Sequence, residues 1–332
     1  MAPQPTVSAP PRGSHTAAGA IGLAISAVAL VAVVWWAVHQ PAPRFPSSAA
    51  QLGALVGAVV SYAIPTALRA ERWLALLRHS GAPPPRSDAY ALTIVGYMGN
   101  NVLPLRAGDL MRIYLMAPRA RTSMRNVLGS LIAERLLDVL VLLVLFVVLA
   151  YGLLRGIEAP SGTALGIAAA VVSAVGILAA LAFVLARGTH HGRRLIEFLR
   201  PIATATRQLR GPHGAAMIAL TLAIWLGDAA TVLLVGESVG LDITPIQAVY
   251  LIALGSGFLL IPSGPAYAGT LDAAMLVGVR AIGGSGSEAV SFLLMYRFAV
   301  QVPITLVGLA VLAVRYGGRS AWRSAQTEGA GP

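Results

Sequence analysis

The stretch GYMGNNVLPLRAGDLMR, residues 96–112, interrupts an apolar segment with residues that a membrane-spanning helix rarely carries at its centre. Pro104 cannot continue the backbone hydrogen bonding of a helix, and Gly108 permits a close approach of another backbone. Asn100 and Asn101, two of the three asparagines in the chain, accept turn conformations and offer both donors and acceptors. Because unpaired backbone groups are costly in hydrocarbon, this break predicts a protein interior or a water-filled cavity at bilayer depth.

A second break follows in the other half of the chain, where residues 255–272 read GSGFLLIPSGPAYAGTLD. An apolar run again meets a proline, then a glycine, then an acidic residue that begins a new apolar run. Broken segments in two halves of opposite orientation predict a binding site near the bilayer midplane. The alternative is a pair of ordinary proline-kinked helices or surface turns. The candidate site residues on this break are Pro262, Ser263, Gly264, Tyr267 and Asp272.

Composition places the whole chain in a membrane. Of the 332 residues, 57% are apolar and 11% are charged, whereas a soluble domain is about 25% charged. The basic residues are all arginine, and neither lysine nor cysteine occurs. A Walker A phosphate loop, Schiff-base chemistry, disulfides and thiolate metal sites are therefore excluded.

A spanning helix needs about 20 mostly apolar residues. The sequence predicts an all-α polytopic membrane protein with six full transmembrane helices and two re-entrant broken helical hairpins in two pseudo-inverted halves. The hairpins are expected near 89–104 and 247–281. The six full spans are expected at 20–38, 49–68, 127–154, 163–186, 214–236 and 289–314.

The arginines test this map. If both hairpins return to the side they entered, 19 of the 24 arginines lie on one side and three on the other, as the positive-inside rule requires of the cytoplasmic side. We therefore expect both termini in the cytoplasm, with a leader at 1–19, the transmembrane domain at 20–315 and a tail at 316–332. The first span is expected to be an uncleaved anchor, with a signal peptide as the alternative. The abundance of alanine, glycine, proline and arginine without lysine indicates a bacterial source of high GC content, and we expect the protein in the bacterial cytoplasmic (inner) membrane.

Charged residues also occur inside the expected spans, where they are functional candidates by default. Glu134, Arg135 and Asp138 share one broad helix face, because their spacings are three and four residues. They form either a self-neutralising structural cluster or a site in which the carboxylates orient Arg135 toward an anionic group. Asp228 and Arg297 have no charged neighbour on their own helices and could pair with each other.

The first break leads into a basic run that contains Arg106 and Arg112. Guanidinium groups bind phosphate in a bidentate manner, so the run could meet lipid headgroups. The alternative is positive-inside anchoring without specificity. We attribute the net charge of +11 to contact with anionic lipid and expect no nucleic-acid partner.

The sequence resembles the membrane domain of the lysylphosphatidylglycerol synthase family, also called the flippase-like family. The matching motifs are residues 69–73 (RAERW), 101–109 (NVLPLRAGD) with Arg112, 134–138 (ERLLD) and 262–269 (PSGPAYAG). The resemblance implies an integral membrane protein that flips aminoacylated phospholipid, while some relatives act in polyprenol-linked sugar assembly. The larger synthases add a soluble aminoacyl-transferase domain. We expect no lipid aminoacylation by this chain, since it ends shortly after the last span.

We therefore expect a lipid translocator that moves an anionic or aminoacylated phospholipid, or a polyprenyl-linked lipid, between leaflets. Arg112, Arg135 and Arg297 would meet the headgroup, and Arg106 would steer it at the cytoplasmic mouth. Hydrogen bonds would come from Asn100 and Asn101. The carboxylates of Asp109, Glu134 and Asp138 would hold the arginines or couple to protons.

Two alternatives stay open at this point. One is a membrane-embedded transferase acting on a polyprenyl-phosphate lipid, with Glu134 and Asp138 as carboxylates. The other is a non-transporting scaffold that binds cell-envelope assembly enzymes. A non-enzymatic role is favoured over an enzymatic one, and we expect neither a cofactor nor a metal.

Overall fold

The computed structural model describes residues 27–28, 30–79, 81, 83–104, 106–153, 211–258 and 264–317, and all regular elements in these ranges are helical. The predicted span at 163–186, the leader and most of the tail lie outside the described residues. The helices are α2 (Ala49–His79), α3 (Arg86–Val102), α4 (Ala107–Arg119), α5 (Met124–Leu153), α8 (Pro212–Ser238), α9 (Pro245–Phe258), η1 (Pro265–Tyr267), α10 (Thr270–Ala281) and α11 (Gly286–Tyr316), and residues 30–38 are helical as well.

Three of the described helices, α2, α8 and α11, are long and apolar enough to cross a membrane. They contain the predicted spans 49–68, 214–236 and 289–314. Helix α2 continues through Arg69 and Arg72 to His79, well past the predicted end. Carboxylates on other helices pair with both arginines.

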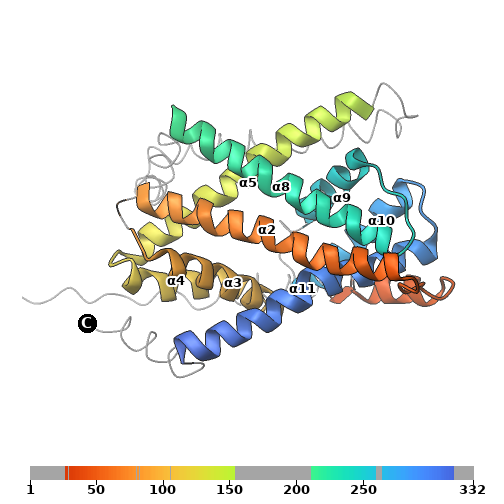
Figure 1. The fold of residues 1–332 in the computed structure, drawn as a ribbon, viewed down its shortest axis with the longest axis horizontal. Coiled ribbons are helices and arrows are strands. Elements are labelled where there is room, and N and C mark those ends of the chain that lie inside the picture. The colour runs from red at the N-terminus through yellow and green to blue at the C-terminus, as the bar shows by residue number, and fades with distance from the viewer. Residues whose placement is uncertain are drawn as a thin grey trace, which may run out of the picture.

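Helices α2 and α8 lie side by side and run in opposite directions (Figure 1). Gly57 near the start of α2 faces Leu234 near the end of α8, while the rings of His79 and His213 stack at the other ends. Gly227 of α8 lets Pro65 of α2 approach closely, since an added Cβ would lie 3.3 Å from the proline ring. Small residues at helix contacts of this kind are typical of membrane proteins.

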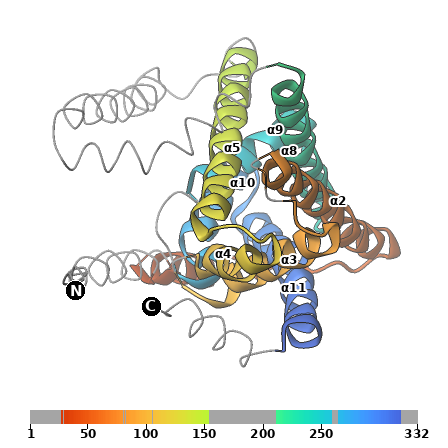
Figure 2. The ribbon, with the colours of Figure 1, turned by 90° about the vertical axis from the view of Figure 1, so that its left-hand side faces the viewer.

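The first break separates two helices that pack backbone against backbone. Helices α3 and α4 lie beside each other in both views (Figures 1 and 2). A Cβ added to Gly108 would lie 1.9 Å from the carbonyl oxygen of Gly96 and 2.5 Å from the backbone nitrogen of Asn100. Glycine is therefore required at 108, where α4 packs directly against α3.

The second break has the same outline. Helix α9 ends at Phe258, and α10 begins at Thr270 after the short helix η1. Gly255 of α9 packs against Met275 of α10, so these two helices also lie together. A large apolar cluster joins α8, α9, α10 and α11, and a second one joins α2, α3, α4 and the end of α11.

Candidate functional site

Both breaks contain non-glycine residues in the left-handed backbone region. Arg106, which precedes α4, has φ 56°, and Ala266 and Tyr267 in η1 each have φ 54°. Such conformations store about 1–3 kcal/mol each and cluster at functional sites. The two strained segments meet, because the Arg106 guanidinium lies 5.7 Å from the centre of the Tyr267 ring.

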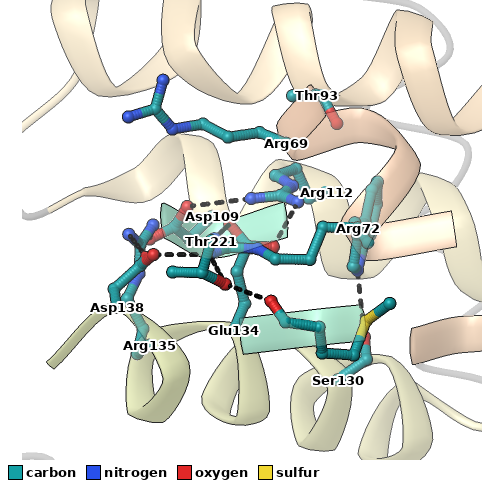
Figure 3. Close-up of polar contacts among 12 residues, drawn as sticks. Arg69, Arg72, Thr93, Asp109, Arg112, Ser130, Glu134, Arg135, Asp138 and Thr221 are labelled. Carbon is teal, nitrogen blue, oxygen red and sulfur yellow. Dashed lines mark hydrogen bonds and ion pairs between the residues drawn. The ribbon is translucent and has the colours of Figure 1, made fainter. Parts of the chain in front are cut away.

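A chain of buried ion pairs joins α2, α4 and α5 (Figure 3). Arg112 of α4 lies 3.0 Å from Glu134, and Arg72 of α2 lies 2.6 Å from Asp138. Arg72 also lies 3.6 Å from Glu134 and donates a hydrogen bond of 2.9 Å to Thr221 of α8. The side chains of Arg72, Arg112 and Glu134 are at most 1% exposed, so each charge depends on its partner for compensation.

Arg135 completes this chain. Its guanidinium lies 3.5 Å from Asp109 and 3.5 Å from Asp138, and its side chain is 37% exposed. The predicted pairing of Arg135 with Asp138 is confirmed. The carboxylates of α5 also pair with arginines of two other helices, Arg72 of α2 and Arg112 of α4.

The suggested pair between Asp228 and Arg297 is wrong. Asp228 forms a bidentate pair with Arg69 of α2, and Arg297 pairs with Asp272 of α10. Sequence spacing could not distinguish these partners, because the choice depends on which helices pack together and on their rotation. Asp272 also accepts a hydrogen bond of 2.8 Å from the backbone of Gly269, which fixes the start of α10.

Helix α11 holds both breaks through one polar stripe at four-residue spacing. Arg297 and Gln301 both donate to the carbonyl of Ala266 in the second break, at 3.3 and 3.2 Å. One turn further, Thr305 accepts a hydrogen bond of 2.9 Å from Asn101 in the first break. Gln301 and Thr305 were not predicted as site residues, although their spacing from Arg297 is a helical signal.

A polar cavity of about 140 Å³ lies where these elements converge. The first break contributes Asn100, Asn101 and Arg106, and the second contributes Tyr267. Of the other predicted site residues, Arg135 and Asp138 also line it. Asp228, which the sequence marked as a charge inside a span, lines it too. The polar lining residues that were not predicted as site residues are Tyr62, Arg69, Tyr97, Trp225, Ser256, Tyr296 and Gln301.

Several predicted site residues support this cavity without lining it. Arg112 faces Glu134 and lies 4.0 Å from the centre of the Trp73 ring, so the expectation that it meets a headgroup does not fit its position. Arg297 likewise holds the second break in place. Asp109 and Glu134 pair with arginines, Gly264 precedes η1, and Pro262 and Ser263 lie outside the described residues.

Three buried polar atoms on the cavity-lining residues have no hydrogen-bond partner among the described residues: Nε1 of Trp225, Oδ1 of Asn100 and Nε of Arg106. Buried polar groups are normally paired with protein, water or ligand. Among the described residues no group of three potential metal-ligating side chains occurs. The side chains that line the cavity offer guanidinium, carboxylate, indole, amide and phenol groups, which suit hydrogen bonding and charge recognition.

Two comparisons with known proteins found a match to this chain. The family model of the lysylphosphatidylglycerol synthase TM region matches residues 19–308. A glycosyltransferase, AglD, from Haloferax volcanii is 25% identical over 295 residues, covering 76% of this chain and 47% of the relative. The chain thus spans about half the length of this curated relative. No solved structure matches. On the family match, the chain belongs to the lysylphosphatidylglycerol synthase transmembrane-region family.

Proposed function

We propose that this protein moves a lipid with an anionic headgroup between membrane leaflets, with the headgroup passing through the polar cavity. One observation carries the proposal: both broken hairpins contribute to a cavity that also contains three arginines. A polar cavity among apolar helices gives a charged headgroup a route that hydrocarbon does not. The lipid tails would remain outside, against the exposed apolar side chains of α2 and α11, which include Val56, Val60, Leu306 and Val307.

The proposal includes a topology. The hairpin α3–α4 would enter the membrane from the cytoplasmic side and return to it. The hairpin α9–α10 would do the same from the outer side. Six full spans would cross the membrane, and both termini would lie in the cytoplasm. Close packing within each pair of helices supports this arrangement, with backbone against backbone between α3 and α4 and glycine against side chains between α9 and α10. Attachment of impermeant thiol reagents to single introduced cysteines in intact bacterial cells tests it, and the natural chain has no cysteine to interfere.

Transport can be measured with purified protein in liposomes that carry fluorescent phosphatidylglycerol. A reductant added outside destroys only the label in the outer leaflet, so the rate at which further label is lost reports movement from the inner leaflet. The natural chain should expose label from the inner leaflet faster than protein-free liposomes do. Arg135→Gln removes one cavity charge and should slow this exposure severalfold. Arg125→Gln is the matched control, because Arg125 is exposed near the start of the same helix.

If movement is absent, or if Arg135→Gln and Arg125→Gln behave alike, the translocation proposal is wrong. Tolerance of alanine at Asn101, Asp109 and Arg135 in cells would instead support a scaffold for envelope-assembly enzymes. These outcomes separate a transport site from a structural one.

A second candidate is transfer of a sugar to or from a lipid-linked phosphate, favoured by the resemblance to a protein named glycosyltransferase. A transferase needs a carboxylate free to act as a base or to bind a metal. Glu134, Asp138 and Asp109 are each engaged by two or more arginines instead. Chemical change of a labelled polyprenyl-phosphate lipid without movement would support this candidate over the first.

A further inference from the structure

The long helices α2 and α11 each pass from one packing unit of the protein to another. In α11, side chains within 289–299 pack around the second break, and side chains within 311–316 pack around the first. In α2, side chains within 55–59 pack around the second break, and side chains within 73–77 pack around the first. We call these clusters the second-break unit, which includes α9 and α10, and the first-break unit, which includes α3 and α4.

Helix α8 divides in the same way. Near its start, Met217 and Leu220 pack on Leu76 of α2 and on α5, beside the first-break unit. Further along, side chains within 229–239 pack in the second-break unit. All three of the described helices that are long enough to cross a membrane therefore connect the two units.

Each of these helices has a weak position where it passes between the units. Pro65 lies inside α2 and Pro303 lies inside α11, in both cases between the two sets of packed side chains. A proline lacks the N–H of a helix hydrogen bond, and sharp helix kinks occur at such residues. In α8 the corresponding residue is Gly227, which favours a helix less than alanine does. A Cβ added to Gly227 would lie 3.3 Å from the Pro65 ring, so the weak positions of α2 and α8 are in contact.

Threonine side chains loosen α2 and α8 further at this level. The Thr66 hydroxyl donates to the carbonyl of Tyr62 at 2.8 Å, and the Thr231 hydroxyl donates to the carbonyl of Gly227 at 3.1 Å. A hydrogen bond of this kind, to the carbonyl four residues earlier, often bends a helix. The features that favour bending are thus concentrated in one layer of the two helices.

The polar cavity lies in the same layer. Each of the three helices contributes residues from next to its weak position to the cavity wall, namely Tyr62 and Arg69 of α2, Trp225 and Asp228 of α8, and Gln301 and Ile304 of α11. A change in the bend of these helices would therefore move the cavity walls relative to each other.

Contacts between the two breaks are long enough to yield. The Arg106 guanidinium lies 5.7 Å from the centre of the Tyr267 ring, and Nδ2 of Asn101 reaches the Gln301 carbonyl only at 3.5 Å, beyond the usual range of about 2.7–3.2 Å. By contrast, Asn101 lies 2.9 Å from Thr305, which follows Pro303 and stays with the first-break unit.

The strong polar contacts between α2 and α8 are compatible with a rotation in this layer. Arg72 and Thr221 both lie on the side of the first-break unit, so their hydrogen bond would move as one piece. The bidentate pair of Arg69 and Asp228 lies next to the contact of Pro65 with Gly227. A rotation displaces atoms least near its axis, so this pair would persist.

We propose that the first-break and second-break units rock against each other about a hinge formed by Pro65, Gly227 and Pro303, and that this motion opens and closes the cavity. Rocking of packed units about a fixed site is a general way to expose that site to the two sides of a membrane in turn. The role of the hinge in transport rests on the proposed function, whereas the motion itself can be measured without it.

Distances between two spin labels, measured by pulsed electron paramagnetic resonance in lipid nanodiscs, test the motion. The natural chain has no cysteine, so Val277→Cys on α10 and Val314→Cys near the end of α11 introduce the only two thiols, both at exposed positions. Val314 follows Pro303 by 11 residues, or about 16 Å of helix. A change of about 20° in the kink would move it by up to about 6 Å.

The chain with its natural prolines should give two distances for this label pair, or one distribution of that width. Pro303→Ala restores the helix hydrogen bond and should leave a single narrow distance. Pro303→Gly removes the same ring but keeps the helix weak, so it should retain the broad distribution. The pair Leu110→Cys and Val314→Cys lies within the first-break unit and should give a narrow distance in every variant.

The transport assay in liposomes tests the role of the hinge. Pro303→Ala should slow lipid movement severalfold, and Pro303→Gly should slow it less. Pro118→Ala is the matched control, because Pro118 is an exposed proline inside α4, within the first-break unit. It should change neither the distances nor transport.

A single narrow distance with Pro303 in place, or equal distributions with Pro303 and with alanine there, would overturn the hinge even if transport occurs. Loss of the second distance in Pro303→Ala with unchanged transport would overturn its role in opening the cavity. Two distances that Pro303→Ala reduces to one, in a protein that moves no lipid, would leave the hinge standing and refute the proposed function.

Discussion

Glu134→Gln should destabilise the protein strongly, because it strands a buried arginine. The substitution keeps the shape of the side chain and removes its charge. Arg72 would still have Asp138 at 2.6 Å, but Arg112, which is 1% exposed, would keep Asp109 at 3.9 Å as its one carboxylate partner among the described residues. Removing one partner of a buried pair costs about 3–5 kcal/mol. Reversible unfolding in mixed detergent micelles, followed by circular dichroism, would measure the loss.

A matched control separates this effect from a general loss of charge. Glu71 lies on α2 and pairs with Arg86, but the Arg86 side chain is 66% exposed. Glu71→Gln should therefore change the free energy of unfolding far less than Glu134→Gln does. Adding Arg112→Met to Glu134→Gln should restore part of the stability, since it removes the stranded charge. Equal effects of the two single glutamine substitutions, or no recovery in the double variant, would refute the reasoning.

Three further predictions follow from the same contacts. Gly108→Ala should lower the free energy of unfolding by about 1–3 kcal/mol or more through overpacking, because its Cβ would lie 1.9 Å from the Gly96 oxygen. Gly53→Ala, in open space on α2, should raise it by about 0.5–1 kcal/mol. A lower melting temperature for Gly53→Ala than for Gly108→Ala would contradict both. Asp228→Asn should lower the melting temperature in detergent by stranding Arg69, whereas Asp242→Asn in the exposed loop before α9 should not; equal melting temperatures would contradict the pairing. Trp73→Phe should cost about 1–2 kcal/mol, because it removes a 3.0 Å hydrogen bond to Ser130 and weakens the contact with Arg112; unchanged unfolding would contradict the role of both contacts.

The two breaks could be predicted because their signals are local. Proline, glycine and paired asparagines act within a few residues of the chain, and the structure ends α3 at Val102 and α9 at Phe258, close to the expected positions. The pairing of Arg135 with Asp138 was equally readable, since three-residue spacing on a helix brings the side chains together.

The long-range partners could not be read in this way. Arg69 meets Asp228 across 159 residues, and only the packing of α2 on α8 decides that contact. The aromatic cavity residues Tyr62, Tyr97, Trp225 and Tyr296 were missed for another reason. Aromatic rings in apolar helices face lipid, core or cavity with similar sequence patterns, so composition does not distinguish these environments.

The measurement that tests the central claim most directly is the reactivity of a single cysteine in the cavity. Ser256 lines the cavity, and Val307 lies on the exposed apolar surface of α11. The natural chain has no cysteine, so Ser256→Cys introduces a single thiol. We express its rate with each water-soluble thiosulfonate as a ratio to the rate of the same reagent with a free thiol in solution. This ratio should be larger for an anionic reagent than for a cationic one. Short-chain phosphatidylglycerol should slow that reaction, and the Val307→Cys thiol in liposomes should stay unlabelled. Failure of the Ser256→Cys thiol to react, or a preference for the cationic reagent, would contradict an anion-accepting cavity shared by the two breaks.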